Sequence, residues 1–292
     1  MDYIIAQYRI RTIGAHNDLS ECRLRGFKPF IVEEDLSQEP TMELHTDTSL
    51  SLADFGETTM LQEFTFEASY SQCRFARYAN GYVFSMSKDD YDMIFTSEFG
   101  SNIIKSNYAL LPEIDPSLLR FGLWMSFGIL TAPLGAIAIH SSVIVKDDMA
   151  ILCLGESGTG KSTHTRLWRE NIEGAHLLND DSPIIRMVDG VPTAFGSAWS
   201  GKTPCFRNLS YPIKGFIRLS QAPYNAIHKL PVLNAIGALL PSCPPAFAHD
   251  TALQDAVCET LSAMISTVPV YHLECLPNGD AAKLSYSTLF NK

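Results

Sequence analysis

Hydrophobic residues fall into two different patterns along this chain of 292 residues. Up to about residue 115, apolar positions gather in short segments rich in β-branched and aromatic side chains, which predict strands. These segments are residues 3–10, 64–68, 73–79, 81–86 and 91–96. Asn80-Gly81 predicts a hairpin turn, whereas the polar and acidic residues 33–54 predict a loop. We therefore expect a smaller β-rich domain at residues 1–115.

From residue 116 onward, segments of strand length and helix length alternate. Asp115-Pro116-Ser117 has the composition of a turn and a helix N-cap, after which residues 118–131 predict a helix. Further helices are predicted from Thr163 to near Gly174 and at 232–240, 251–266 and 280–290, and strands at 137–145, 149–154, 177–178, 183–188, 214–219 and 270–276. This alternation predicts an α/β domain at residues 116–292.

One polar loop of this domain has the composition of a phosphate-binding loop. Gly155-Glu156-Ser157-Gly158-Thr159-Gly160-Lys161-Ser162 stands between an apolar strand and a helix, which is the order that the motif requires. Glycines let backbone N–H groups turn toward phosphate oxygens, the lysine adds a mobile positive charge, and the serine hydroxyl is a ligand for Mg²⁺. The N-terminal end of the following helix adds positive potential. We expect the residues from Gly155 to Thr163 to bind the phosphates of a cofactor.

Two adjacent carboxylates follow the loop. Asp180 and Asp181 come directly after the apolar pair Leu177-Leu178. Ser162 and one of the two aspartates can hold Mg²⁺, which prefers hard oxygen ligands. The other aspartate can act as a general base on a hydroxyl, since a like charge beside it raises its pKa unless the metal offsets that effect. The alternative is an exposed turn, because residues 179–182 also have turn-forming composition.

The order of these segments resembles the catalytic core of the HPr serine kinase/phosphorylase family. The resemblance rests on residues 139–145, the loop 155–162 and residues 177–181. It implies a P-loop kinase domain of the type shared with phosphoenolpyruvate carboxykinase, and ATP and Mg²⁺ as its cofactors. It also implies that Asp180 is the acid/base, that Asp181 binds the metal with Ser162, and that His140 lies near the transferred phosphate. Without that resemblance, His140 at the end of an apolar run is equally typical of a core histidine.

A second polar loop at residues 198–208 carries two cations. Lys202 and Arg207 could neutralise charge on the transferred phosphoryl group or bind the acceptor, whereas ordinary surface solvation is the alternative. The loop departs from the glycine- and arginine-bearing signature of HPr kinase, so neither the acceptor of that family nor its reverse phosphorolysis follows from the resemblance. We therefore assign Asp180, His140, Lys161, Lys202 and Arg207 as candidate catalytic residues.

These residues together predict a Mg²⁺- and ATP-dependent kinase that transfers phosphate to a hydroxyl, with serine of a protein or peptide as the expected acceptor. A small-molecule hydroxyl kinase and a nucleotide-dependent binding module without transfer remain alternatives. Retention of Lys161 and both aspartates argues against the binding module. A carboxykinase is a further alternative, because residues 157–161 also resemble the loop of that family, but the chain is too short to carry that family's separate oxaloacetate-binding domain.

Composition and charge indicate which partners and which cellular compartment to expect. The net charge is −10. It arises before Ser117, where the chain has 19 acidic and 9 basic residues, because the residues from Ser117 onward include 13 of each. Without a basic stripe, binding to nucleic acid is not expected. The seven scattered cysteines form no C-x-x-C pair, and the N-terminus lacks a basic, apolar leader, which favours the cytoplasm. Residues 118–139 contain Arg120 and Pro133, so we expect a buried helix and no membrane span. A homo-oligomer is possible from the resemblance.

Overall fold

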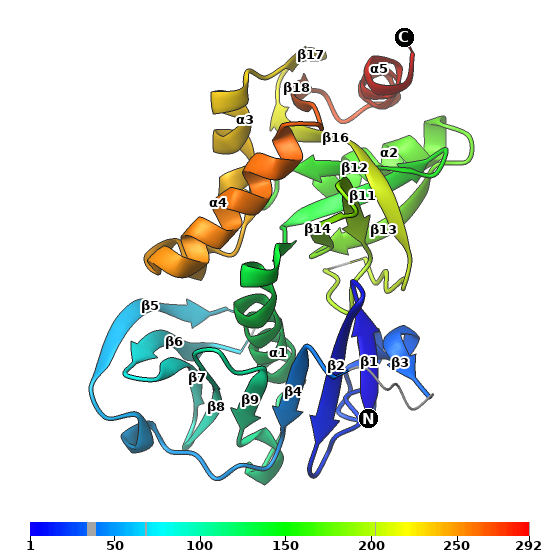
Figure 1. Ribbon diagram of the computed structural model, residues 1–292. Coiled ribbons are helices and arrows are strands. Elements are labelled where there is room, and N and C mark those ends of the chain that lie inside the picture. The colour runs from blue at the N-terminus through cyan, green and yellow to red at the C-terminus, as the bar shows by residue number, and fades with distance from the viewer. Residues whose placement is uncertain (34–38, 68, 202, 292) are drawn as a thin grey trace. The chain divides into compact units, whose positions relative to one another are not determined.

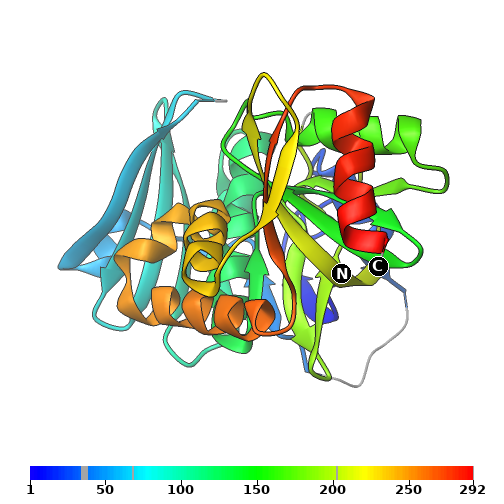
Figure 2. The same ribbon diagram turned by 90° about the horizontal axis from the view of Figure 1, so that it is seen from above.

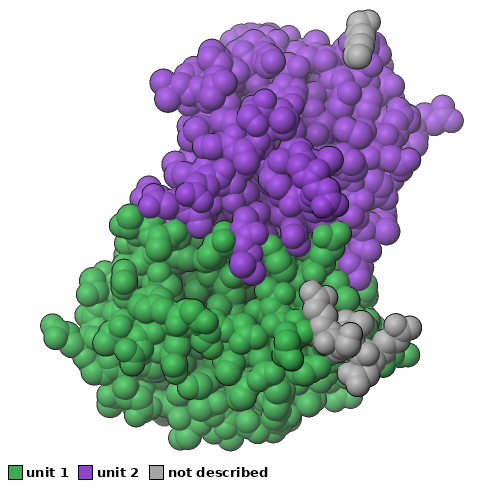
Figure 3. Space-filling view, in the orientation of Figure 1, with its two compact units in different colours: residues 1–133, 246–253 green, residues 134–245, 254–292 purple. Residues whose placement is uncertain are grey.

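The computed structural model describes residues 1–33, 39–67, 69–201 and 203–291. These residues form a mixed α/β chain with two compact units (Figure 3). Each unit is built on a large sheet. Unit 1 consists of Met1–Pro133 and Ala246–Leu253, and unit 2 of Leu134–Pro245 and Gln254–Lys292.

Unit 1 contains one sheet of nine strands in the order β3-β1-β2-β4-β9-β8-β7-β6-β5 (Figure 1). The strands are β1 (Asp2–Ile5), β2 (Tyr8–Ile13), β3 (Ile31–Val32), β4 (Met42–His45), β5 (Thr58–Phe66), β6 (Ser71–Tyr78), β7 (Gly81–Lys88), β8 (Tyr91–Glu98) and β9 (Ile103–Ser106). Short 3₁₀ helices are η1 (Arg25–Phe30), η2 (Leu52–Phe55) and η3 (Tyr108–Leu110). The β-rich character predicted for this part of the chain is confirmed.

Two expectations for unit 1 were wrong in detail. The predicted single strand 3–10 is a hairpin, because Ala6 and Gln7 both adopt positive φ and reverse the chain between β1 and β2. The predicted loop 33–54 contains β4, in which buried Met42 and Leu44 alternate with Glu43 and His45. Such an alternation of only four residues is masked by the acidic residues around it.

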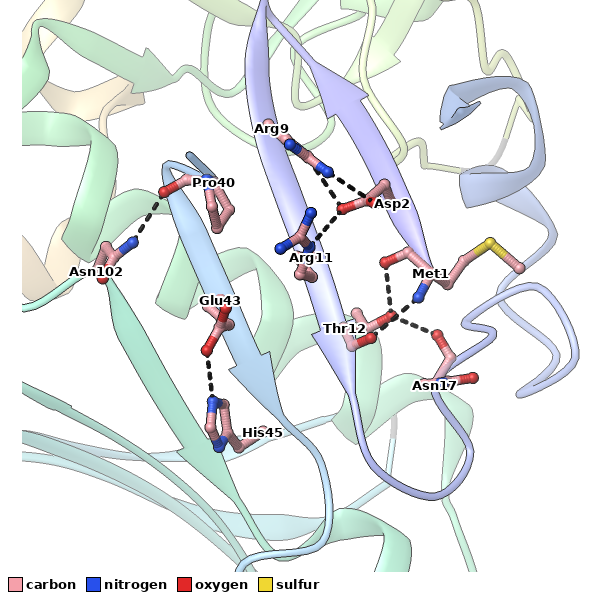
Figure 4. Close-up of polar contacts among 10 residues, drawn as sticks. All are labelled: Met1, Asp2, Arg9, Arg11, Thr12, Asn17, Pro40, Glu43, His45 and Asn102. Carbon is pink, nitrogen blue, oxygen red and sulfur yellow. Dashed lines mark hydrogen bonds and ion pairs between the residues drawn. The ribbon is translucent and has the colours of Figure 1, made fainter. Parts of the chain in front are cut away.

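The β1–β2 hairpin is fastened by a carboxylate shared between two arginines (Figure 4). Arg9, which is buried, donates from Nε and Nη2 to the two carboxylate oxygens of Asp2 at 3.1 and 3.0 Å, and Arg11 Nε donates to Asp2 Oδ1 at 3.2 Å. Burial raises the pKa of Asp2, but the two arginines outweigh it and hold that pKa below its usual value. The charge of Arg9 is therefore compensated where it is buried.

Helix α1 (Pro116–Thr131) begins where the sequence predicts. The Asp115 carboxylate accepts hydrogen bonds from the backbone N–H groups of Ser117 at 2.8 Å and Leu118 at 3.3 Å, and Pro116 occupies the first helical turn. The helix packs against β7 and β8, so the compact units divide the chain after Pro133 and not at residue 115. By length and hydropathy Pro116–Leu134 could cross a membrane, yet 61% of that window is buried within the protein.

Unit 2 is built on the path β10-β14-β15-β16-β12-β11-β13, with β18 beside β16 and β17 beside β18. Its strands are β10 (Ala136–Ala138), β11 (Ser141–Lys146), β12 (Met149–Leu154), β13 (His176–Asp181), β14 (Ile184–Val188), β15 (Val191–Phe195), β16 (Ser210–Gln221), β17 (Ala226–Lys229) and β18 (Val270–Cys275). Its helices are α2 (Lys161–Asn171), α3 (Val232–Leu239), α5 (Gly279–Phe290), most of α4 (Thr251–Ile265) and the 3₁₀ helix η5 (Leu240–Ser242). The 3₁₀ helices η4 (Ala132–Leu134) and η6 (Pro245–His249) stand where the chain passes from one unit to the other.

The predicted strand 137–145 is divided in two. The chain leaves the sheet at Ile139 and His140, whose backbone N–H groups donate to the carbonyls of Pro183 at 3.1 Å and Ser242 at 2.7 Å. Because these partners lie outside the β11–β12 ladder, β10 instead pairs with β14. The break puts His140 directly before β11.

One face of the unit 2 sheet is covered by α2 and α5, which lie side by side (Figure 2). Trp168 of α2 is fully buried in a cluster with Ile151 of β12 and Ile217 of β16. Leu289 of α5 belongs to the same cluster. This apolar packing fixes α2 relative to the strand before it, and therefore fixes the loop that joins them.

Candidate active site in unit 2

The predicted phosphate-binding loop joins β12 to α2, as its sequence requires. Gly155, Gly158 and Gly160 have φ angles of 147°, 82° and 105°, a region that side chains disfavour. A Cβ on Gly155 would also lie 2.5 Å from Thr159 Oγ1. The backbone N–H and hydroxyl of Thr159 both donate to the carbonyl of Glu156, at 3.2 and 2.8 Å. The glycines are therefore needed for the path of the chain.

The first turn of α2 opens toward this loop. Gly160 is the N-cap and supplies no side-chain hydrogen bond. Its carbonyl accepts the first helical bond, from His164 N at 2.8 Å. The N–H groups of the first turn and the positive end of the helix dipole are thus available to an anion.

Lys161 folds back over the loop. Its ammonium donates to the carbonyls of Gly155 at 2.8 Å and Glu156 at 3.1 Å, and the residue is only 9% exposed. Burial lowers the pKa of Lys161, and the charges of Asp181 and Asp180 oppose that shift. The cation therefore lies within electrostatic reach of both aspartates.

The two aspartates occupy the end of β13, beside the start of α2. The hydroxyl of Ser162 donates to Asp180 Oδ1 at 2.9 Å. Asp180 is 5% exposed, whereas the side chain of Asp181 is 40% exposed. Asp181 has a φ angle of 141°, which is strained for a residue with a side chain. A strand end with one buried carboxylate excludes the alternative of an exposed turn.

His140 lies next to the second aspartate. Its Nε2 is 3.7 Å from Asp181 Oδ1, and its side chain is 46% exposed. Partial burial and then the charge of Lys161 lower the pKa of His140, with Asp181 and Asp180 opposing. The imidazole is therefore biased toward its neutral form, in which it can accept or donate a proton. It is not the core histidine of the alternative interpretation.

A buried amide fastens the end of β13 to the second polar loop. Asn179 Nδ2 donates to the carbonyl of Trp199 at 3.0 Å, and its Oδ1 accepts from Ser182 N at 3.0 Å. The backbone of Gly201 donates to the carbonyl of Asp180 at 2.7 Å. The loop that begins at Ala198 is thus held beside the aspartates.

Of the two cationic residues predicted in that loop, the structure describes one. Lys202 lies outside the described residues. Arg207 is exposed, and its guanidinium lies near the thiol of Cys205. Burial raises the pKa of Cys205, and the positive charge of Arg207 opposes that shift. Cys205 Sγ in turn contacts the carbonyl of Leu178 at 3.3 Å. Arg207 therefore belongs to the region beside β13, although it does not contact Asp180 directly.

Two residues at this site were missed in the sequence. Arg218 of β16 directs Nη2 toward Glu156 Oε1 at 3.8 Å and donates from Nη1 to the carbonyl of Ala238 at 3.2 Å. Gln221 Nε2 donates to the carbonyl of Gly158 at 3.2 Å. A charged residue within the apolar strand 214–219 was the one signal for Arg218. Gln221 had no signal, because only the pairing of β16 with β12 brings it to the loop.

A cavity of about 520 Å³ adjoins the loop. Its walls are formed by Thr159, Gly160, Thr163, His164, Leu167, Leu219, Gln221, Ala222, Pro223, Cys275, Leu276 and Pro277. The volume and the mostly apolar lining are typical of small-molecule sites, which span roughly 300–1,000 Å³. Three separate segments build the cavity, so no single stretch of sequence could indicate it.

The remaining loop positions are divided between solvent and this cavity. Glu156 and Ser157 are exposed, while Thr163 is half-buried and lines the cavity. Ser162 and Asp180 present hard oxygen atoms, with Asp181 as the next residue, and this donor set fits Mg²⁺. Unit 2 therefore brings the loop, Lys161, Ser162, both aspartates and His140 together.

Comparison with known proteins finds a structural likeness but no match in sequence. No protein-family model matches the sequence, and no curated protein matches it. Among solved structures, the chain is similar to the HPr(Ser) kinase/phosphatase from Coxiella burnetii, with 13% identity and a TM-score of 0.30 over 52% of this chain and 93% of that one. A likeness of this size does not define the chemistry, which must follow from the residues of this chain.

Proposed function

We propose that unit 2 is a kinase domain that uses ATP and Mg²⁺ to phosphorylate a hydroxyl group, with serine of a protein or peptide as the acceptor. The observation that carries the proposal is the 2.9 Å contact between Ser162 Oγ and Asp180 Oδ1 beside a phosphate-binding loop. A loop that bound only an anion would not need a carboxylate at its serine. A bound divalent cation explains why a negative charge is kept there.

The cavity favours a nucleotide as the phosphate donor. It lies between the loop and the chain segments after β16 and β18, and it offers apolar walls with Gln221 as a polar group. This combination suits a nucleoside attached to phosphates in the loop. Free phosphate or pyrophosphate would leave such a cavity unused.

The contacts favour Asp180 as a metal ligand and Asp181 as the general base. Ser162 contacts Asp180, so these two residues would hold Mg²⁺, which neutralises charge on the transferred phosphate when bound. Asp181 is more exposed and lies 3.7 Å from His140. Asp181, with His140 beside it, is thus the better general base for the acceptor hydroxyl. This assignment exchanges the roles that the resemblance to HPr kinase implied.

The cations complete the electrostatic arrangement. Lys161 would leave its carbonyl partners for the phosphates of ATP, since both offer oxygen acceptors but only the phosphates carry full charge. Arg207 lies near Cys205 on the loop beside β13, and we assign this cation to binding the incoming acceptor. A small molecule with a hydroxyl group could use the same groups, so the acceptor must be tested directly.

Labelled ATP and an extract of the source organism test this proposal. The wild-type protein should transfer label to a polypeptide, and Asp180→Asn and Asp181→Asn should each slow transfer at least about 100-fold, since both metal and base would be needed. Asp189→Asn is the matched control, because Asp189 is an exposed turn residue at a φ of 48° that asparagine also tolerates. Label in a metabolite would favour the small-molecule alternative. Absence of any transfer by the wild type, or full activity of both site variants, would refute the kinase.

A further inference from the structure

Two histidines and a glutamate meet on the edge hairpin of unit 2. Strands β17 and β18 are antiparallel, and His228 is the register partner of His272. Glu274 follows His272 by two residues, so both side chains lie on the same face of β18. Directly opposed residues of a strand pair have Cβ atoms about 4.5–5.5 Å apart. The sheet thus brings His228 of β17 beside His272 and Glu274 of β18, more than 40 residues later in the sequence.

The ligand atoms of these side chains are close enough for one ion. One nitrogen of each imidazole and one oxygen of Glu274 all lie within 4.8 Å of one another. The two imidazole rings are 5.2 Å apart, edge to face at 83°. Around an ion with bonds of about 2.0–2.1 Å, tetrahedral ligands are separated by roughly 3.3 Å. Small rotations of the side chains would therefore close the site.

We propose that His228, His272 and Glu274 bind a divalent transition metal of the zinc class. Two neutral imidazoles and one carboxylate are a donor set that Zn²⁺ takes with a fourth position left to water. Mg²⁺ disfavours such a set because it selects oxygen ligands. The proposed ion is thus chemically different from the Mg²⁺ assigned to Ser162 and Asp180, and the proposal does not depend on kinase activity.

Neighbouring groups already orient two of the three ligands. Ser220 Oγ lies 2.8 Å from His272 Nε2, and the hydroxyl of Tyr224 donates to Glu274 Oε1 at 3.1 Å. Hydrogen bonds of this kind fix the orientation of ligating side chains in metal sites. Arg218, the register partner of His272 on β16, directs its guanidinium to the carbonyl of Ala238 and to Glu156.

An ion at this position would fasten one wall of the cavity. Gln221 ends β16 and Cys275 ends β18, and both residues line the cavity beside the phosphate-binding loop. Residues 222–225 connect β16 to β17, and Asn225 already accepts a hydrogen bond from Leu276 N at 2.8 Å. By linking β17 to β18, the metal would hold this connection in place.

Titration of the metal-free protein with ZnCl₂ and CoCl₂ tests the site without any assay of activity. Calorimetry of the wild type should detect Zn²⁺ binding that weakens at least about tenfold in His228→Gln and His272→Gln. Co²⁺ should give absorption bands of a four- or five-coordinate ion in the wild type that the variants lose. His249→Gln, which changes an exposed histidine outside the cluster, should bind both metals as the wild type does.

Folding of the variants is checked by circular dichroism, and Glu274→Gln supplies a third variant that removes one oxygen charge while keeping the shape. Equal loss of Zn²⁺ affinity in this variant supports the three-ligand site. Absence of Zn²⁺ binding by the wild type, or unchanged binding in the folded histidine variants, would overturn the proposal.

Discussion

His164 is a buried titratable group directly behind the phosphate-binding loop. It is 3% exposed, its Nε2 lies 3.1 Å from Ser285 Oγ, and Trp168 Nε1 donates to it at 3.2 Å. Burial lowers the pKa of His164 to about 4. The sequence offered no role for this histidine. Its partners are Trp168, one helical turn later on α2, and Ser285 on α5, which is distant in the sequence. Its neutral ring is part of the packing that holds α2.

Unit 2 should therefore lose stability as the pH falls below about 6.5. An unfolded histidine binds a proton near pH 6.5, whereas folded His164 resists protonation until about pH 4. The folded state thus binds fewer protons in this window, and its stability is full above pH 6.5 and declines toward pH 4. From pH 8 to pH 5 the loss attributable to His164 is roughly 2 kcal/mol.

Amide hydrogen exchange of the β12 and α2 segments at pH 8 and pH 5 would measure this loss, after correction for the intrinsic exchange rate. His164→Gln should show a smaller difference between the two pH values, because the other titrating groups are unchanged. An identical difference in the wild type and the variant would contradict a neutral, buried His164.

Among the elements, α1 depends on a glycine where helix propensity would favour alanine. Gly122 is buried in the helix, and a Cβ there would lie 2.1 Å from the ring of Phe95 on β8. The predicted helix and its N-cap at Asp115 are confirmed, but the sequence could not indicate why Gly122 is present. The close approach of helix and sheet explains it.

Gly122→Ala should destabilise unit 1 by about 1–3 kcal/mol, because the added methyl group overpacks the contact with Phe95. Gly237→Ala is the matched control on α3, where a Cβ meets no atom within 4 Å. The control should be neutral or stabilising by up to about 1 kcal/mol through helix propensity. Urea denaturation of both variants, with hydrogen exchange to assign the unit, would measure the difference. Equal effects of the two substitutions would disprove close packing at Gly122.

Two departures from the predicted elements, β17 and the separate strand β10, share one cause. β17 is a four-residue edge strand, and β10 is separated from β11 only because Ile139 and His140 bond to Pro183 and Ser242. Partners of this kind are distant in sequence, and no local pattern records them. The same limit hid the cluster of His228, His272 and Glu274, which exists only through the pairing of β17 with β18.

At the scale of the whole molecule, the order of motifs was the most informative signal. Strand, glycine loop, helix and paired aspartates predicted that Ser162 would share its surroundings with a carboxylate, and the structure brings Ser162 Oγ to Asp180. The cavity and the place of Gln221 in it could not be predicted, because three chain segments converge there. The predicted boundary at residue 115 differs from the division after Pro133, since α1 packs on the sheet of unit 1.

The central claim is that nucleotide, Mg²⁺ and the aspartate pair meet in unit 2. Calorimetric titration with ATP, in Mg²⁺ and again in EDTA, tests it most directly in the wild type, Asp180→Asn and Asp181→Asn. We predict that Mg²⁺ tightens ATP binding at least about tenfold in the wild type, which corresponds to about 1.4 kcal/mol. Asp180→Asn should lose this gain and Asp181→Asn should keep it. Absence of heat from ATP in the wild type, or a full Mg²⁺ gain in both variants, would contradict the account.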